Sequence, residues 1–485
     1  MPGHLVEHSS GDAVLMVRWQ SISQVIHDDL GQLFSTTPDN WPRKTRFKKR
    51  WNLTLYFLLL FIYFCYFPLW QGRVVPEMMS PTSLVEPEWL RVLSERQPIV
   101  AEMLAKSTEE QRRLGYFHTL REICQQPTTW THTCALMRGQ AARLQSILAG
   151  IASLTLTGSG SSEYAGDVVR LPLQNELDII TQAIGGGVLL THGSRALPPG
   201  RPGLMVSIAR SGDSPESAGT LALMLRTQPE IRHLVLTCNA GGSVARTYQA
   251  DPRALVITLD EETNDQGLVM TSSFTNLVLA ARFLGLLAQP ERYQIICEQL
   301  SRMASAFIRE HLGSIAGVAK APFKRALFLA SASRFGAARE AALKMLEMTA
   351  GRVTTLCETY LGLRHGPMSY IHGDTLVVCF LSSDPRLRAY EADLLRELDQ
   401  KELGLLKILV GEGVHGDLVR DNDLVLECKG LEQVGDENFP VIDVIAGQLL
   451  AFFRCREEGL RPDSPSEDGV ISRVVQTFAL HLPHD

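Results

Sequence analysis

The stretch from Leu204 to Ser217, LMVSIARSGDSPES, decides the fold of this 485-residue chain. Its first five residues, Leu204 to Ile208, form a short apolar run, which predicts a buried strand. The run ends at a turn built from Arg, Ser, Gly, Asp and Ser, and the Pro-Glu-Ser that follows is typical of a helix N-terminus. A buried strand, a Gly/Ser turn and a helix in this order predict one unit of a parallel α/β sheet.

A second turn of the same kind lies earlier in the chain. Residues Thr157 to Ser162, TGSGSS, follow the apolar run Leu154–Leu156 and precede a helical pattern. Glycine lets the backbone approach an anion closely, and serine hydroxyls and the free N–H groups of a first helical turn donate to it. One such turn is weak evidence, because serine also caps ordinary helices. Two of them on adjacent strands favour an anion site, although neither has the spacing of a Walker A or dinucleotide motif.

The apolar runs occur in two sets, which indicates a duplication. Four runs recur in the same order about 170 residues further along the chain. The pairs are Leu154–Leu156 with Leu327–Leu329, Leu204–Ile208 with Thr375–Cys379, Leu234–Leu236 with Ile408–Val410, and Leu255–Ile257 with Leu424–Leu426. Each copy predicts a doubly wound, flavodoxin-like parallel sheet, in which ligands bind beyond the carboxyl ends of the strands at the switch point.

This duplication divides the chain into five parts. We expect an N-terminal extension over residues 1–79, a helical segment over 80–148, one α/β domain over 149–300, a second over 301–460, and a tail over 461–485 that closes the site. In the helical segment, the apolar spacing predicts helices over residues 86–106 and 109–125. Gln126-Pro127 is expected to end the second helix, and Thr128-Thr129 to cap the next one.

Composition and charge limit the partners. The net charge of -6 leaves no basic footprint, which argues against nucleic acid. The nine cysteines are scattered and form no C-x-x-C pair, which argues against a disulfide framework and a zinc site. We therefore expect a cytoplasmic protein that uses neither a metal nor a cofactor.

Two stretches carry polar residues suited to a small-molecule site. Residues 262–273 form either a loop that lines a ligand or a turn followed by a capped helix, and the sequence leaves both open. Residues 335–351 predict a helix with Glu340, Lys344 and Glu347 on one face. We interpret Glu340 and Lys344 as a solvated ion pair, and Glu347 as a candidate acid–base residue.

A histidine follows that helix in the segment Leu363–Pro367, LRHGP. By itself, His365 is as consistent with loop structure as with catalysis. Proton transfer between adjacent carbons needs one carboxylate on one face of the substrate, and ring opening needs a group that titrates near neutrality. Glu347 and His365 suit these two tasks.

Together these motifs resemble the SIS (sugar isomerase) domain, over both repeats from about Gln125 to the C-terminus. The finer details are similar to one group, the galactosamine-6-phosphate deaminases and tagatose-6-phosphate ketose/aldose isomerases. Those details are Glu122-Ile123, Gln126-Pro127, Trp130, Arg210–Ser217, Met270–Ser273 and Arg473–Gln476. The resemblance implies that Ser162, Arg210, Ser211 and Ser214 bind the phosphate of a sugar phosphate. It also implies that Thr271, Ser272 and Glu358 line the sugar.

The resemblance also assigns the catalytic roles. It implies that Glu347 moves a proton between C1 and C2 and that His365 opens the ring from the neighbouring subunit, so a homodimer or larger assembly with shared active sites is expected. Arg473 stands in the tail where the related glucosamine-6-phosphate synthases have a lysine, and arginine cannot form a Schiff base. We expect no glutaminase domain before the repeats, and therefore no ammonia transfer from glutamine.

These features lead to a functional hypothesis. The expected reaction converts a hexosamine 6-phosphate, galactosamine 6-phosphate first, to the ketose 6-phosphate and ammonia. A plain ketose/aldose phosphate isomerase and a non-catalytic sugar-phosphate sensor are the alternatives. Because a sensor could dispense with Glu347 and His365, their joint presence favours an enzyme.

The N-terminus conflicts with a cytoplasmic protein. Residues 51–71 are uncharged, apolar and long enough to cross a bilayer, and a basic run over residues 43–50 precedes them. The positive-inside rule would place everything after residue 71 outside, away from cytosolic sugar phosphates. Either the segment is a true anchor, which would make the membrane a partner, or residues 1–77 are not part of the functional protein and synthesis starts at Met78 or Met79. We favour the second interpretation.

Overall fold

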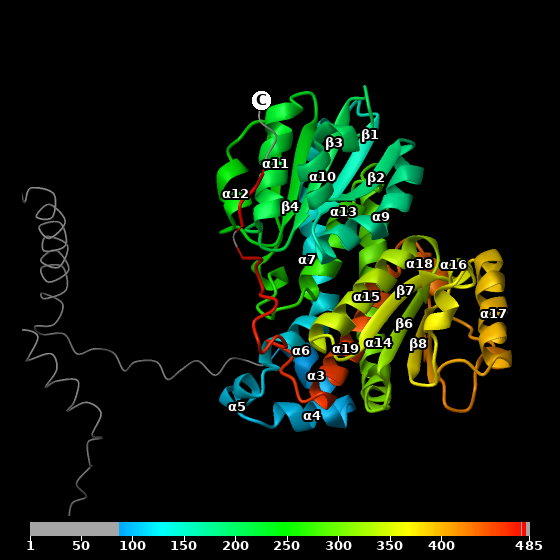
Figure 1. The fold of residues 1–485 in the computed structure, drawn as a ribbon. Helices are drawn as coiled ribbons and strands as arrows, with labels where there is room; N and C mark the ends of the chain where they lie inside the picture. The colour runs from blue at the N-terminus through cyan, green and yellow to red at the C-terminus, as the bar shows by residue number, and fades with distance from the viewer. Residues whose placement is uncertain (1–86, 477, 482–485) are drawn as a thin grey trace, which may run out of the picture. The chain divides into compact units, whose positions relative to one another are not determined.

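The computed structural model describes residues 87–476 and 478–481, and these contain two five-stranded parallel sheets (Figure 1). The strand orders are β2-β1-β3-β4-β5 and β7-β6-β8-β9-β10, so both sheets have the same topology. The first sheet consists of β1 (Ser153–Gly158), β2 (Ile180–Gly185), β3 (Gly203–Ala209), β4 (Arg232–Thr237) and β5 (Ala254–Thr258). The second consists of β6 (Arg325–Ala330), β7 (Thr354–Thr359), β8 (Thr375–Phe380), β9 (Leu406–Gly411) and β10 (Leu424–Glu427). The predicted duplicated α/β fold is confirmed.

The two sheets also share their register at the centre. Ser153 pairs with Gly203 between β1 and β3, and Arg325 pairs with Thr375 at the same place between β6 and β8. In each sheet the strand order changes direction at this central pair, which makes it the switch point where ligands bind in such folds. We call the two copies repeat 1 (β1–β5) and repeat 2 (β6–β10).

Helices connect the strands of each repeat. Those of repeat 1 are α9 (Ser161–Leu177), α10 (Gly186–His192), α11 (Pro215–Thr227), α12 (Ser243–Tyr248) and α13 (Ser272–Arg282). The long α14 (Pro290–Ala319) leads to repeat 2, whose helices are α15 (Phe335–Met348), α16 (Tyr360–Leu363), α17 (Pro385–Gln400), α18 (Leu431–Val434) and α19 (Pro440–Glu457). Short 3-10 turns are η2 (Gly193–Ala196), η3 (Glu261–Thr263), η4 (Ala332–Arg334), η5 (Pro367–Tyr370) and η6 (Gly416–Leu418).

One continuous apolar core joins the two repeats through α9 and α15. Gly336 on α15 has no room for a side chain, since a Cβ there would lie 2.7 Å from the backbone nitrogen of Val168 on α9. On the other side of α15, Ala341 packs in the same way against Gly447 of α19. These small residues bring the helices into close contact, so α15 is covered on both sides.

Within the described part of the chain, which starts at residue 87, six short helices precede repeat 1. They are α3 (Glu88–Arg96), α4 (Pro98–Leu104), α5 (Thr108–Arg113), α6 (Phe117–Cys124), α7 (Gln126–Gly139) and α8 (Ala141–Leu148). The two long helices predicted here are wrong, because Pro98 starts a new helix and Gly115, with φ +70°, interrupts the second. The predicted cap is also wrong: α7 already begins at Gln126 with Pro127 in its first turn, and Thr129 is buried inside it.

Within residues 87–476 and 478–481, no helix is long and apolar enough to cross a membrane. The apolar segment 51–71, the basic run before it and the alternative starts at Met78 and Met79 lie outside the described residues. Both interpretations of that segment therefore stay predictions.

Candidate active site

The two Gly/Ser turns of repeat 1 that are expected to bind an anion, called the anion turns, follow β1 and β3. These are the central strands of its sheet. Ser162 lies in the first turn of α9, and Gly158 before it is required because a Cβ there would lie 2.6 Å from the Cβ of Ser162. Ser211 accepts a hydrogen bond from the Asp213 amide (3.2 Å). Ser214 is the N-cap of α11, accepting from the Ser217 amide (3.2 Å). Among the described residues, no carboxylate accepts a bond from the Ser162, Ser211 or Ser214 hydroxyl.

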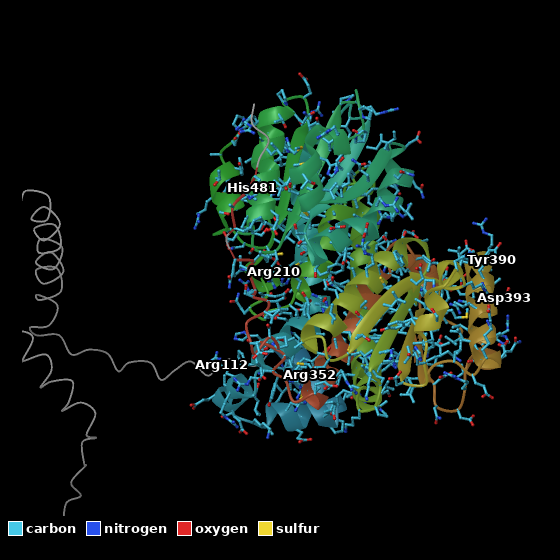
Figure 2. The ribbon with its side chains drawn as sticks, in the orientation of Figure 1. Arg112, Arg210, Arg352, Tyr390, Asp393 and His481 are labelled. Atoms are coloured by element: carbon cyan, nitrogen blue, oxygen red, sulfur yellow. The ribbon has the colours of Figure 1, made fainter. Side chains whose placement is uncertain are left out.

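Arg210 directly follows β3 and is buried. Its guanidinium donates to the carbonyl oxygen of Leu268 (3.0 Å) and to that of Arg473 in the C-terminal tail. Figure 2 shows Arg210 beside that tail. Burial lowers the pKa of Arg210, while the nearby carboxylates of Asp265 and Glu347 act to raise it. Arg210, which is expected to bind phosphate in repeat 1, is thus close enough to interact electrostatically with Glu347, the acid–base candidate in repeat 2.

Glu347 lies near the end of α15 and is held by Lys344. The Lys344 Nζ is 2.5 Å from Glu347 Oε2, 3.2 Å from Glu340 Oε1 and 3.1 Å from the Ser161 hydroxyl of α9. The Lys344 and Glu340 side chains have no exposed surface, whereas that of Glu347 is 23% exposed. The expectation of a solvated Glu340–Lys344 pair is therefore wrong, because α9 and α19 cover that face of α15.

Burial shapes the protonation of this group. It raises the pKa of Glu340 to about 7, although Lys344 opposes the shift. Burial alone would lower the pKa of Lys344, but the carboxylates of Glu340 and Glu347 outweigh it, and the pKa is raised. Lys344 is thus a buried ammonium that holds the Glu347 carboxylate beside the first turn of α9.

Thr271 and Ser272 form part of a helix cap. Asp265 accepts hydrogen bonds from the amides of Thr271 (2.7 Å), Ser272 (3.0 Å) and Ser273 (2.9 Å), and from the Thr271 hydroxyl (2.9 Å). The Ser272 hydroxyl lies 3.4 Å from that of Thr129. The structure thus has the capped helix, one of the two alternatives for residues 262–273, and it directs both hydroxyls to intrachain partners.

The C-terminal tail docks on this capped loop. Arg473 donates from Nε to the carbonyl oxygen of Asp265 (2.7 Å) and from a terminal nitrogen to Asn264 Oδ1 (2.8 Å). Below the loop, Glu122 of α6 accepts from the amides of Gln266 (2.5 Å) and Gly267 (3.2 Å). Burial, and then Asp265, raise the pKa of Glu122 to about 8. Sequence reasoning gave Glu122 no structural role, since its partners are backbone amides far along the chain.

Among the described residues, two expected site residues make no hydrogen bond or ion pair with this group. His365 is exposed in the loop after α16, and its amide donates to the Gly362 carbonyl oxygen (2.9 Å). Glu358, at the end of β7, accepts from the Thr359 amide (2.7 Å). The structure therefore brings together Ser162, Arg210, Glu347 and Arg473 around the turns of repeat 1, and leaves His365 facing solvent.

In residues 87–476 and 478–481, no group of three or more His, Cys, Asp or Glu side chains is placed to hold a metal ion. The eight cysteines of this part are all free thiols.

The fold and this cluster of Arg, Ser, Lys and Glu define the class, a phosphosugar isomerase built on two SIS domains. The solved tagatose-6-phosphate ketose/aldose isomerase from Escherichia coli has a TM-score of 0.67 and 30% identity, covering 73% of this chain and 95% of that one. The D-galactosamine-6-phosphate deaminase AgaS of Shewanella sp. strain ANA-3 is 34% identical over 380 residues, 77% of this chain and 94% of its own.

A Streptomyces coelicolor protein that also carries the name AgaS is 36% identical over 377 residues, 76% of this chain and 96% of its own length. No protein-family model matches the chain. The chain belongs to the AgaS family of sugar-phosphate deaminases and isomerases, and it is an enzyme of this type.

Proposed function

We propose that the enzyme converts galactosamine 6-phosphate and water to tagatose 6-phosphate and ammonia. The observation that carries the proposal is the position of Glu347, held 2.5 Å from the buried ammonium of Lys344. Lys344 also bonds Ser161, next to the turn that is expected to bind the phosphate. A substrate held by its phosphate at these turns would present its other end to a fixed carboxylate, as C1–C2 proton transfer requires.

The proposed steps use side chains of this chain and its neighbour. His365 of the neighbouring subunit opens the sugar ring, and Glu347 then removes the C2 proton to give an enolamine. Glu347 returns the proton to C1, which produces a ketimine at C2. Water adds to the ketimine and ammonia leaves, giving the ketose. Arg210 and the hydroxyls of Ser162, Ser211 and Ser214 bind the phosphate throughout, since charge-assisted hydrogen bonds are the strong ones.

The tail would close the site over the bound sugar. Arg210 donates to the Arg473 carbonyl oxygen, and Arg473 is anchored to the loop of Asn264 and Asp265. Because Arg210 would contact both the phosphate and the tail, phosphate binding would favour closure of the tail over the site. Such a cover would keep bulk water from the enolamine, and it has to admit the one water molecule that hydrolyses the ketimine.

An ammonia-release assay tests the proposal. Galactosamine 6-phosphate and glucosamine 6-phosphate are supplied separately, and ammonia and ketose phosphate are measured together. We expect equal amounts of both products from galactosamine 6-phosphate. The second candidate is a plain ketose/aldose isomerase, which the name of the solved Escherichia coli relative favours. Conversion of tagatose 6-phosphate to an aldose phosphate, without any ammonia from either amino sugar, would establish that function and overturn the deaminase.

A further inference from the structure

Repeat 2 has its own pair of turns at the equivalent switch point, and they contain serines. Ser331 follows β6, while Ser382 and Ser383 come just after β8. Because the central strands of the two sheets share one register, these turns occupy the places that the anion turns occupy in repeat 1. The candidate active site uses none of these three serines.

All three serine hydroxyls donate to carboxylates of the same chain. Asp436 accepts from the Ser382 hydroxyl, the Ser383 hydroxyl (3.0 Å) and the Ser383 amide (2.9 Å). Glu391 accepts from the Ser331 hydroxyl (2.8 Å) and the Ser382 amide (2.8 Å). Hydroxyls and amides from two strand-end turns that converge on negative oxygens form the donor set of an anion cradle.

Two arginines complete this cradle. Arg334, whose side chain is 1% exposed, donates to both oxygens of Asp443 (2.7 and 2.5 Å) and lies 3.8 Å from Asp436. Arg388 donates from Nε to the Ser382 carbonyl oxygen (2.7 Å) and lies 3.9 Å from Glu391. Fixed guanidinium groups beside serine hydroxyls are also what Arg210 and its neighbouring serines provide in repeat 1.

Of the carboxylates in the cradle, Asp436 is the one that solvent reaches. Its side chain is 18% exposed, whereas those of Glu391 and Asp443 are fully buried. Asp436 also comes from the loop after α18, outside the two turns, and it follows Gly435 with φ +77°. A phosphate arriving from solvent would therefore meet the donors that Asp436 now occupies.

We propose that repeat 2 retains an anion-binding cradle in which the carboxylate of Asp436 stands where a phosphate would bind. The cradle is closed in the native chain, so of the two repeats we expect repeat 1 alone to bind a phosphate ester. Removing the Asp436 carboxylate opens the cradle to inorganic phosphate or a phosphate monoester. The proposal goes beyond the deaminase function and concerns a second site.

The test counts phosphate sites on the full chain by equilibrium dialysis with radiolabelled inorganic phosphate. Asp436→Ala should bind one more phosphate per chain than the wild type. The matched control is Asp393→Ala, an exposed carboxylate on α17 (Figure 2), which should leave the number unchanged. The double variant Asp436→Ala/Ser383→Ala should lose the gain, because it lacks one of the freed donors.

The outcomes separate this proposal from the deaminase function. If the wild type binds no phosphate, the phosphate site of repeat 1 fails, while a gain in Asp436→Ala still supports the cradle. A folded Asp436→Ala chain that binds no more phosphate than the wild type overturns the proposal. If this variant does not fold, a high concentration of inorganic phosphate should restore folding by binding the native state. Failure of phosphate to restore it overturns the proposal equally.

Discussion

The two repeats have the same sheet topology and strand register, but they place their charged side chains differently. In repeat 1 the hydroxyls of Ser162, Ser211 and Ser214 donate to no carboxylate of the described residues. In repeat 2 the turn serines are bonded to Asp436 and Glu391, and the helix carries the acid–base candidate. Duplication thus supplied two equivalent frames, of which we expect one to bind an anion and the other to hold a base.

This division explains why the helices that cross between the repeats are so tightly packed. Lys344 of repeat 2 donates hydrogen bonds to Glu347 and to Ser161 of repeat 1. It therefore connects the acid–base candidate to the turn that is expected to bind phosphate. Around that point Gly336 allows α15 to approach the backbone of α9. Packing in the core therefore sets the position of Glu347 relative to the turn that is expected to bind phosphate, without a flexible loop.

The largest expected effect comes from breaking that link with Lys344→Met. The change leaves the fully buried Glu340 without its partner, and loss of one member of a buried pair costs about 3–5 kcal/mol. The matched control is Lys401→Met, because Lys401 and Glu397 form an exposed pair at the same spacing. That variant should lose about 1 kcal/mol or less. Urea unfolding monitored by circular dichroism gives both values.

A double variant sharpens this result. Lys344→Met/Glu340→Gln removes the charge of both partners and should recover most of the lost stability, since no uncompensated charge stays buried. If Lys344→Met and Lys401→Met cost the same, the buried ion pair contributes no more than a surface pair. The account of the contact between the repeats would then be wrong.

Glu347→Gln should separate the two functions of the molecule. The amide keeps the size of the side chain and the helix, but it cannot accept a proton, so we expect turnover to fall by about 10²-fold or more. Phosphate binding in repeat 1 should survive. Steady-state kinetics measure the first effect and dialysis with inorganic phosphate the second, with Glu457→Gln at an exposed position of α19 as the control. Turnover within a few-fold of the wild type would place the base elsewhere.

A pair of serine variants compares the two cradles directly. Ser211→Ala should raise KM about 10-fold to 100-fold, because a hydrogen bond to a charged group contributes about 1.5–3 kcal/mol. Ser383→Ala, in the turn of repeat 2, should leave KM unchanged, because its hydroxyl bonds Asp436 of the same chain. Equal changes in KM for both variants would mean that the substrate phosphate does not distinguish the repeats.

The sequence was sufficient for the fold but only for part of the site. Eight strands were predicted because they are continuous apolar runs, whereas β2 and β7 are half-exposed edge strands without such a run. The buried Glu340–Lys344 pair could not be recognised, because the same spacing occurs on solvent-facing helices. The closed cradle could not be found either, since Asp436 contacts Ser382 from 54 residues away and Glu391 contacts Ser331 from 60 residues away, and such contacts form no local motif.

The last prediction, with the smallest effect, concerns His365, which is exposed in this chain. If it serves the neighbouring subunit, the inactive variants Glu347→Gln and His365→Ala should complement each other when mixed. In a mixed dimer, one site lacks both groups and the other has both intact. Random exchange makes about half of the dimers mixed, so about a quarter of wild-type activity should return. Each variant mixed with itself is the control, and native mass spectrometry follows the exchange. If exchange is demonstrated and no activity returns, His365 does not act across a shared site, and the role of ring opening has to pass to a group within the same chain.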